Sequence, residues 1–331
     1  MKKYFLPSPI KELRVRYWYE GVRRQLGEAS AFGLEKRFDR KLSDQDDSKL
    51  GSTKKWPRYK NGRRVPQSKL VASVEVEVPG SSKELGSVLW PVLLADEISL
   101  RKAPRYINQL EPDLRRAIAN WRRAEATGTR NLLWYSQGRT LVGAGSLDAL
   151  AALVLIWEIY RHQAHDDGMR TAAELIYRCM LVVGDTFKAR GLLAEFFGVL
   201  NAKVFSRTTW ENGRCILDAE MFAQGVDRLN HTVTTVRDEG KLQSQKAIDR
   251  VKKSLIYGKK GYDCLFGLGI PIVPDWRVGP PTRGQQQDGM LKLLQWFWGW
   301  THLTNQTIGK FPFDDLWRDL EADIEAESGF W

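Results

Sequence analysis

The chain has 331 residues, of which 43% are hydrophobic, and it carries a formal net charge of +11. This apolar content supports a sizeable core and excludes wholesale disorder, while the longest apolar run, Ala149–Trp157, is too short to span a membrane. The three cysteines are widely separated, which excludes a disulfide framework, and they form no CxxC pair of the kind found in zinc fingers. The first residues do not resemble a signal peptide, so we expect a cytoplasmic protein.

The positive charge is concentrated at the start of the sequence. Residues 1–90 contain 20 Lys and Arg against 11 Asp and Glu. Residues 91–130 contain 8 against 5, and the rest of the chain contains 23 against 24. This asymmetry predicts a polyanion-binding N-terminal part and a different role for the remainder.

Four helices are predicted in the N-terminal part. The first covers Pro9–Leu26, and the second covers residues 31–38 with Ser30 as its N-cap and Phe32, Leu34 and Phe38 as apolar positions. A third begins near Thr53 and ends at Asn61-Gly62, and a fourth opens at Pro66. The alternation over Val74–Val78 also suits a strand. Residues 79–82 read as a domain boundary.

The remaining pattern is mostly helical. The predicted helices are Pro104–Arg123, Leu147–His165, Met169–Val183, Thr186–Val199, Asp218–Val236, Lys241–Tyr257, Gln287–Leu303 and Phe313–Glu327. Residues 267–289 read as a linker or interaction loop. The expected fold is therefore mainly α. It comprises a helix-turn-helix-like domain over 1–80, a connecting segment with a basic helix over 81–146, and a helical domain over 147–331.

The densest basic stretch is Lys54–Leu70, where seven of seventeen residues are Lys or Arg and none is acidic. Cations at this density repel one another unless a polyanion neutralises them. Trp56 and Tyr59 would anchor a helix to the core, or one of them would touch sugar and phosphate. Alternatives are a solvated basic face, or contact with an acidic protein or a membrane surface. The predicted nucleic-acid contacts are Lys54, Lys55, Arg58, Lys60, Arg63, Arg64 and Lys69.

The run from Tyr59 through Gly62, Arg63 and Arg64 to Pro66 resembles the end of the recognition helix in Cro/lambda-repressor-like helix-turn-helix domains. The resemblance covers roughly residues 10–80 and implies an aromatic closing that helix, a glycine stopping it and basic residues meeting the DNA backbone. The sequence departs from the family in one respect, because some fifteen polar residues separate the two motif helices between Phe38 and Lys54.

A second basic segment lies at Pro104–Arg123. Its cations are Arg105, Arg115, Arg116, Arg122 and Arg123. Arg115, Arg122 and Trp121 come near one another at helical spacing. The segment is either an ordinary exposed helix face or an extension of the DNA contact.

A candidate metal or catalytic cluster follows the long apolar run. Spacings of four and three place Glu158, His162 and His165 on one helix face, where such sets can bind zinc or iron. No second ligand set is apparent, so a structural role with no bound metal or other cofactor is expected. The Arg161–His165 pair resembles the Arg/His motif of HEPN ribonucleases, with a shorter gap. No catalytic residue is assigned.

Two features suggest protein partners or self-assembly. The first is the aromatic run that contains Trp296, Trp298 and Trp300. The second is the acidic C-terminus from Phe311, which could dock on a partner or on the basic N-terminal part. Packing within the core and a solvated helix are the alternatives.

These features favour a DNA-binding regulator that assembles into oligomers. The first alternative is a non-catalytic nucleic-acid-binding subunit or effector of an antiphage or mobile-element complex. The second alternative is a HEPN-like or metal-dependent nuclease.

Overall fold

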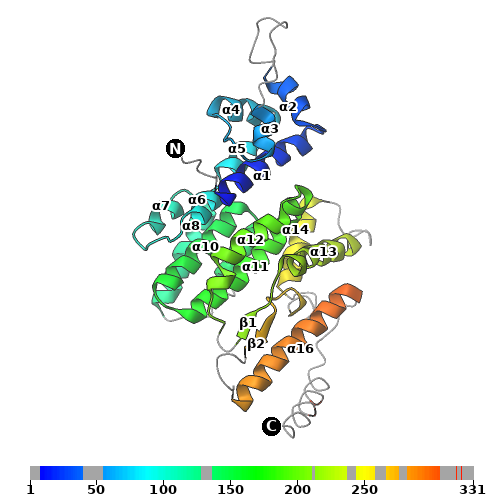
Figure 1. Cartoon of the computed structure of the whole chain (residues 1–331). Coiled ribbons are helices and arrows are strands. Elements are labelled where there is room, and N and C mark those ends of the chain that lie inside the picture. The colour runs from blue at the N-terminus through cyan, green and yellow to red at the C-terminus, as the bar shows by residue number, and fades with distance from the viewer. Residues whose placement is uncertain are drawn as a thin grey trace, which may run out of the picture.

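The computed structural model describes residues 8–39, 55–127, 136–210, 213–236, 244–257, 266–275 and 282–305, together with residues 318 and 322. Within these ranges the chain is mainly α-helical, as predicted. Figure 1 shows the first five helices grouped above a larger helical body. None of the described helices is both long enough and apolar enough to cross a membrane.

The first five helices surround an aromatic core of their own. They are α1 (Pro9–Gln25), α2 (Ala31–Phe38), α3 (Lys55–Lys60), α4 (Ser68–Glu77) and α5 (Ser81–Gly86). The aromatic core contains Trp18, Tyr19, Phe38, Trp56 and Tyr59, packed with aliphatic side chains that include Leu85 of α5. The predicted cap is confirmed, because the Ser30 hydroxyl accepts from Gly33 N at 3.3 Å. The prediction of an apolar position at Phe32 is wrong, since this side chain is 66% exposed.

The body contains the remaining elements. They are α6 (Leu89–Leu94), α7 (Ala103–Ile107), α8 (Pro112–Ala126), α9 (Gly138–Ala144), α10 (Leu147–His162), α11 (Asp166–Ala189), α12 (Leu193–Lys203), η4 (Phe205–Arg207), β1 (Gly213–Cys215), α13 (Ala219–Val236), α14 (Gln245–Ile256), β2 (Ile272–Pro274) and α16 (Arg283–Asn305). The apolar run forms the buried α10, which packs along α11 at the centre of the main core. Each helix buries one stripe against its neighbours.

Three predicted boundaries in the body are wrong for local reasons. The predicted gap between the helices Met169–Val183 and Thr186–Val199 is absent, because α11 continues through Gly184. The lack of a side chain at Gly184 allows α13 to approach closely: a Cβ there would lie 2.5 Å from Val226 Cγ2. The helix instead ends near Gly191, whose φ is +69°. The predicted single helix Pro104–Arg123 is divided into α7 and α8. Pro112 opens α8, since proline is tolerated in the first turn of a helix.

The predicted linker at residues 267–289 contains regular structure, so that prediction is wrong. Its strand β2 pairs antiparallel with β1, with Arg214 opposite Val273. The helix α16 then begins within the same stretch, at Arg283. The predicted helix Phe313–Glu327 lies outside the described residues except for positions 318 and 322.

Helix α1 joins the two groups of helices. It contributes Leu13 and Tyr17 to the main core and Trp18 to the aromatic core. From the end of α11, the buried Arg190 guanidinium donates to Tyr17 O at 2.9 Å and to both carboxylate oxygens of Glu84 at 2.6 and 2.8 Å. This forked contact fixes α1 and α5 against the body.

Candidate nucleic-acid interface

Helix α3 has one buried and one exposed face. Trp56 and Tyr59 are buried, as predicted for anchoring residues. The Trp56 ring stacks on Trp18 with centroids 6.0 Å apart and meets Tyr59 edge-on at 5.6 Å. Arg58 points away from the two rings, Lys60 is the last residue of this short helix, and both are exposed. The two rings therefore hold the helix so that its cations face solvent.

The turn after α3 depends on Gly62. Its φ is +67°, the left-handed region predicted for this position. A Cβ on Gly62 would lie 2.6 Å from Glu12 Cα, so the turn also presses against the backbone of α1. The exposed Arg63 and the half-buried Arg64 follow this turn directly. A tight turn supported by α1 thus carries the next two predicted cations.

The residues Ser68–Glu77 form helix α4, and not a strand. Its Leu70 and Val74 are buried, while Lys69 is exposed. Lys69 is therefore a further exposed cation of the N-terminal helices. Lys54 lies outside the described residues.

Most of these cations lack an acidic partner. Among the described residues, no carboxylate lies within 4.0 Å of the charged nitrogens of Arg58, Lys60, Arg63, Arg64 and Lys69. Lys55 differs, because its Nζ lies 3.8 Å from Asp39 Oδ1. Burial raises the pKa of Tyr59, and the nearby Arg64 charge opposes this shift, so the phenol stays neutral and does not offset that charge. We call Arg58, Lys60, Arg63, Arg64 and Lys69 the N-terminal basic face.

One further cation was not singled out from the sequence. Lys36 is exposed in the last turn of α2, which packs on α3. Its neighbour Arg37 is engaged, with Nε 2.5 Å from Glu77 Oε2. The periodicity of the predicted helix 31–38 would have placed Lys36 on its solvent side.

Helix α5 is attached to α4 by a carboxylate. Glu75 accepts hydrogen bonds from Gly80 N at 2.7 Å and from Ser82 N at 2.6 Å. Donation by the Ser82 and Gly80 N–H groups lowers the pKa of Glu75 to about 2, from a reference value of 4.5. Because the folded pKa is depressed, the carboxylate stabilises the fold above about pH 4.5, and this contribution is lost as the pH falls toward 2.

We therefore expect Glu75→Gln to reduce stability by about 0.5–1 kcal/mol at neutral pH, the usual size of a helix-terminal carboxylate contribution. The difference between wild type and variant should shrink steadily as the pH falls from about 4.5 to about 3. Urea unfolding across this range measures it. A difference that is independent of pH would contradict this role.

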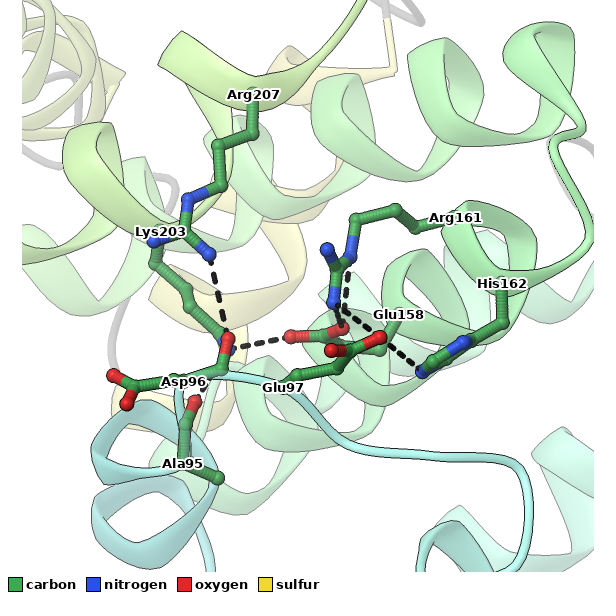
Figure 2. Close-up of polar contacts among 8 residues, drawn as sticks. All are labelled: Ala95, Asp96, Glu97, Glu158, Arg161, His162, Lys203 and Arg207. Carbon is green, nitrogen blue, oxygen red and sulfur yellow. Dashed lines mark hydrogen bonds and ion pairs between the residues drawn. The ribbon is translucent and has the colours of Figure 1, made fainter.

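Two of the metal or catalytic candidates, Glu158 and His162, lie in a different environment, which Figure 2 shows. Glu158 is fully buried, and its Oε1 lies 2.5 Å from Nζ of the buried Lys203. Arg161 donates to Glu158 Oε2 at 2.9 and 3.1 Å. Lys203 Nζ also donates to Ala95 O at 2.6 Å and Asp96 O at 3.1 Å. This network ties α10 to α12 and to the segment after α6.

The two histidines do not join Glu158 in a ligand set. His162 Nε2 lies 3.3 Å from Glu97 Oε1. His165 follows the end of α10 and caps α11, its Nδ1 accepting from Gly168 N at 2.9 Å. Arg161 and His165 therefore have separate partners. Within the described residues, no group of three or more His, Cys, Asp or Glu side chains is placed to hold a metal ion.

The aromatic run lies in α16 and packs partly within the chain. Trp296 is buried and stacks on Trp300 with ring centroids 5.0 Å apart. The Arg228 guanidinium of α13 lies 3.3 Å from the Trp300 ring centroid. The ring centroids of Trp298 and His302 lie 4.2 Å apart. Phe297 is 53% exposed. A role of this run in assembly stays a prediction, and the acidic C-terminus lies almost entirely outside the described residues.

No protein-family model, curated protein or solved structure matches this chain.

Proposed function

We propose that this protein binds double-stranded DNA through the N-terminal basic face and acts as a DNA-binding regulator. The observation that carries the proposal is the division of α3 and its following turn into two sides. One side is fixed in the aromatic core by Trp56 and Tyr59, while the exposed Arg58, Lys60 and Arg63 have no acidic partner among the described residues. Such a surface suits phosphate contacts, which supply most of the affinity for nucleic acid.

The position of the aromatic rings favours a duplex over a single strand. Single-strand binders stack successive bases on exposed aromatic side chains. In the described part of α1 to α5, the tyrosines, tryptophans and Phe38 are buried, and Phe32 is the one exposed ring. A row of stacking platforms is therefore missing from this surface, while charge contacts to a duplex backbone need none.

The local order of elements supports a helix-turn-helix type of contact. Tyr59 lies near the end of α3, Gly62 stops the helix, and Arg63 and Arg64 follow at the turn. Pro66 precedes α4 by two residues. These are the positions in which the resemblance to Cro/lambda-repressor-like domains implies an aromatic, a glycine, basic residues and a proline. The regulatory role rests on that resemblance, with the helical body as the oligomerisation, partner or sensor part.

The test is a salt titration of duplex binding by fluorescence anisotropy. We compare wild type with a basic-face variant carrying Arg58→Ala, Lys60→Ala, Arg63→Ala and Arg64→Ala. Because each neutralised phosphate contributes about −0.9 to the slope of log K against log salt, the variant should bind more weakly with a slope flatter by about 3–4.

A matched control removes equal charge from exposed sites elsewhere. It carries Lys188→Ala, Arg207→Ala, Arg214→Ala and Arg250→Ala, again three arginines and one lysine. This control should keep a slope close to that of wild type. If the folded basic-face variant matches wild type in affinity and slope, the face is a solvated charge run and the proposal is wrong.

A further inference from the structure

A second exposed basic surface lies on α7, α8 and the residues before them. Its members are Arg101, Lys102, Arg105, Arg115, Arg122 and Arg123, and all are exposed. We call this set the α7–α8 basic face. Among the described residues, none of the six has a carboxylate within 4.0 Å of its charged nitrogens. This differs from Arg116 in the same helix, which pairs with Asp113.

The amphipathic pattern of α8 fixes the direction of its arginines. Leu114, Ala117, Ile118 and Trp121 are buried against the main core. Trp121 Nε1 donates to Tyr160 OH at 2.8 Å, so this ring is a packing residue and not a surface contact. Arg115 and Arg122 lie beside this buried stripe, and Arg123 lies opposite to it. Arg115 and Arg122 are seven residues apart, which places them about 10.5 Å apart along the same helix face.

Three acids of α8 and the residue before it are engaged with other partners. Glu111 pairs with Lys83 of α5, and Asp113 pairs with Arg116. Glu125 accepts from Tyr160 OH at 2.6 Å. Five of the six cations are arginines, whose planar guanidinium matches phosphate oxygens in a forked geometry. The chemistry of this face therefore fits a phosphate polymer.

The face lies close to the N-terminal helices. The Lys83–Glu111 pair joins α5 to the residue that precedes α8. Figure 1 accordingly shows α7 and α8 beside α6, below α4 and α5. Arg190 holds Tyr17 and Glu84 at the same time, so α1 and α5 are also fixed against the end of α11.

From this arrangement we infer that the α7–α8 basic face is a second contact surface for double-stranded nucleic acid. The choice of a duplex rests on the proposed function. The α7–α8 basic face contacts backbone phosphates and makes no contacts with base edges, so it adds the same affinity for all DNA sequences. An anionic membrane would use the same cations, and this is the alternative outcome of the test.

The experiment compares two full-length variants on one duplex of about 40 base pairs, about 136 Å at 3.4 Å per base pair. The α8 variant carries Arg105→Gln, Arg115→Gln, Arg122→Gln and Arg123→Gln, and the other is the basic-face variant described above. The α8 variant should show a salt slope flatter than wild type by about 3–4, by the same phosphate arithmetic. The charge-matched control at Lys188, Arg207, Arg214 and Arg250 should leave the slope unchanged. Far-ultraviolet circular dichroism confirms that each variant is folded.

The two proposals fail in different ways. A folded α8 variant with the wild-type slope overturns this inference, whereas an unchanged slope in the basic-face variant overturns the proposed function. Binding to phosphatidylserine vesicles is measured in parallel. If the α8 variant loses vesicle binding and keeps its duplex slope, the face is a membrane contact and the inference is wrong. The titration is repeated on a second duplex of unrelated sequence: equal loss on both duplexes supports backbone contact, and a loss confined to one of them contradicts it.

Discussion

Lys203→Met is expected to destabilise the protein by about 3–5 kcal/mol, the usual cost of removing one partner from a buried ion pair. Lys203 and Glu158 are both buried, and their charged atoms lie 2.5 Å apart. Methionine fills similar space but leaves Glu158 with Arg161 alone. It also removes the donor to Ala95 O and Asp96 O. Urea unfolding, with the free energy extrapolated to water, measures the loss.

The matched control is Lys188→Met, the same substitution in an exposed pair. Lys188 contacts Asp227 on the surface, with 46% and 53% of the two side chains exposed. Exposed pairs contribute about 0–1 kcal/mol, so this variant should be nearly as stable as wild type. Adding Glu158→Gln to Lys203→Met should recover part of the loss, because no uncompensated charge then remains buried. If both lysine variants lose the same small amount, the Glu158 charge has another source of compensation.

This network shows where sequence spacing was insufficient. Helical periodicity placed Glu158 and His162 near one another, which is correct for residues four apart. The residue that decides the role of Glu158 is Lys203, which comes from a different helix. No local pattern in the sequence connects these two positions, because their approach depends on how α10 and α12 pack.

The helices of the N-terminal part could be predicted well because their signals are local. Pro9 opens α1, Ser30 caps α2, and Gly62 ends the turn after α3. Boundaries in the body depended instead on tertiary packing. Gly184 falls in the predicted gap between two helices, but in the structure it is the point where α13 approaches α11. The pairing of β1 with β2 was not predicted either, since its partners lie some sixty residues apart and each strand is very short.

The candidate interface was predicted in the same uneven way. Burial of Trp56 and Tyr59 follows from their spacing of three on α3, and this leaves Arg58 outward, while Lys60 is exposed as the last residue of the helix. The sequence could not show which cations are neutralised by acids from other elements. Lys55 meets Asp39 and Arg37 meets Glu77, whereas Arg63 has no such partner among the described residues. Charge density alone therefore overestimates the surface that remains available to a polyanion.

The second large effect is expected for Trp56→Ala, which should destabilise the N-terminal helices by about 3–5 kcal/mol. Trp56 is fully buried at the centre of the aromatic core. Its ring contacts Trp18, Phe38 and Tyr59, with centroids 5.6–6.0 Å apart. Truncation leaves a cavity that the short helix α3 cannot fill by shifting, because Gly62 holds the next turn against the backbone of Glu12.

Two further variants separate this packing role from direct contact with DNA. Phe32→Ala removes an exposed ring from the same group of helices and should change stability by less than about 0.5 kcal/mol. Trp56→Phe keeps an aromatic ring in the core, so it should fold, cost less than Trp56→Ala, and bind duplex DNA with the wild-type salt slope. Thermal unfolding and duplex titration measure the two properties on the same samples. If Trp56→Phe is stable but loses duplex binding, burial of an aromatic ring at this position is not sufficient to position the cations of α3, and the packing role proposed for Trp56 is wrong.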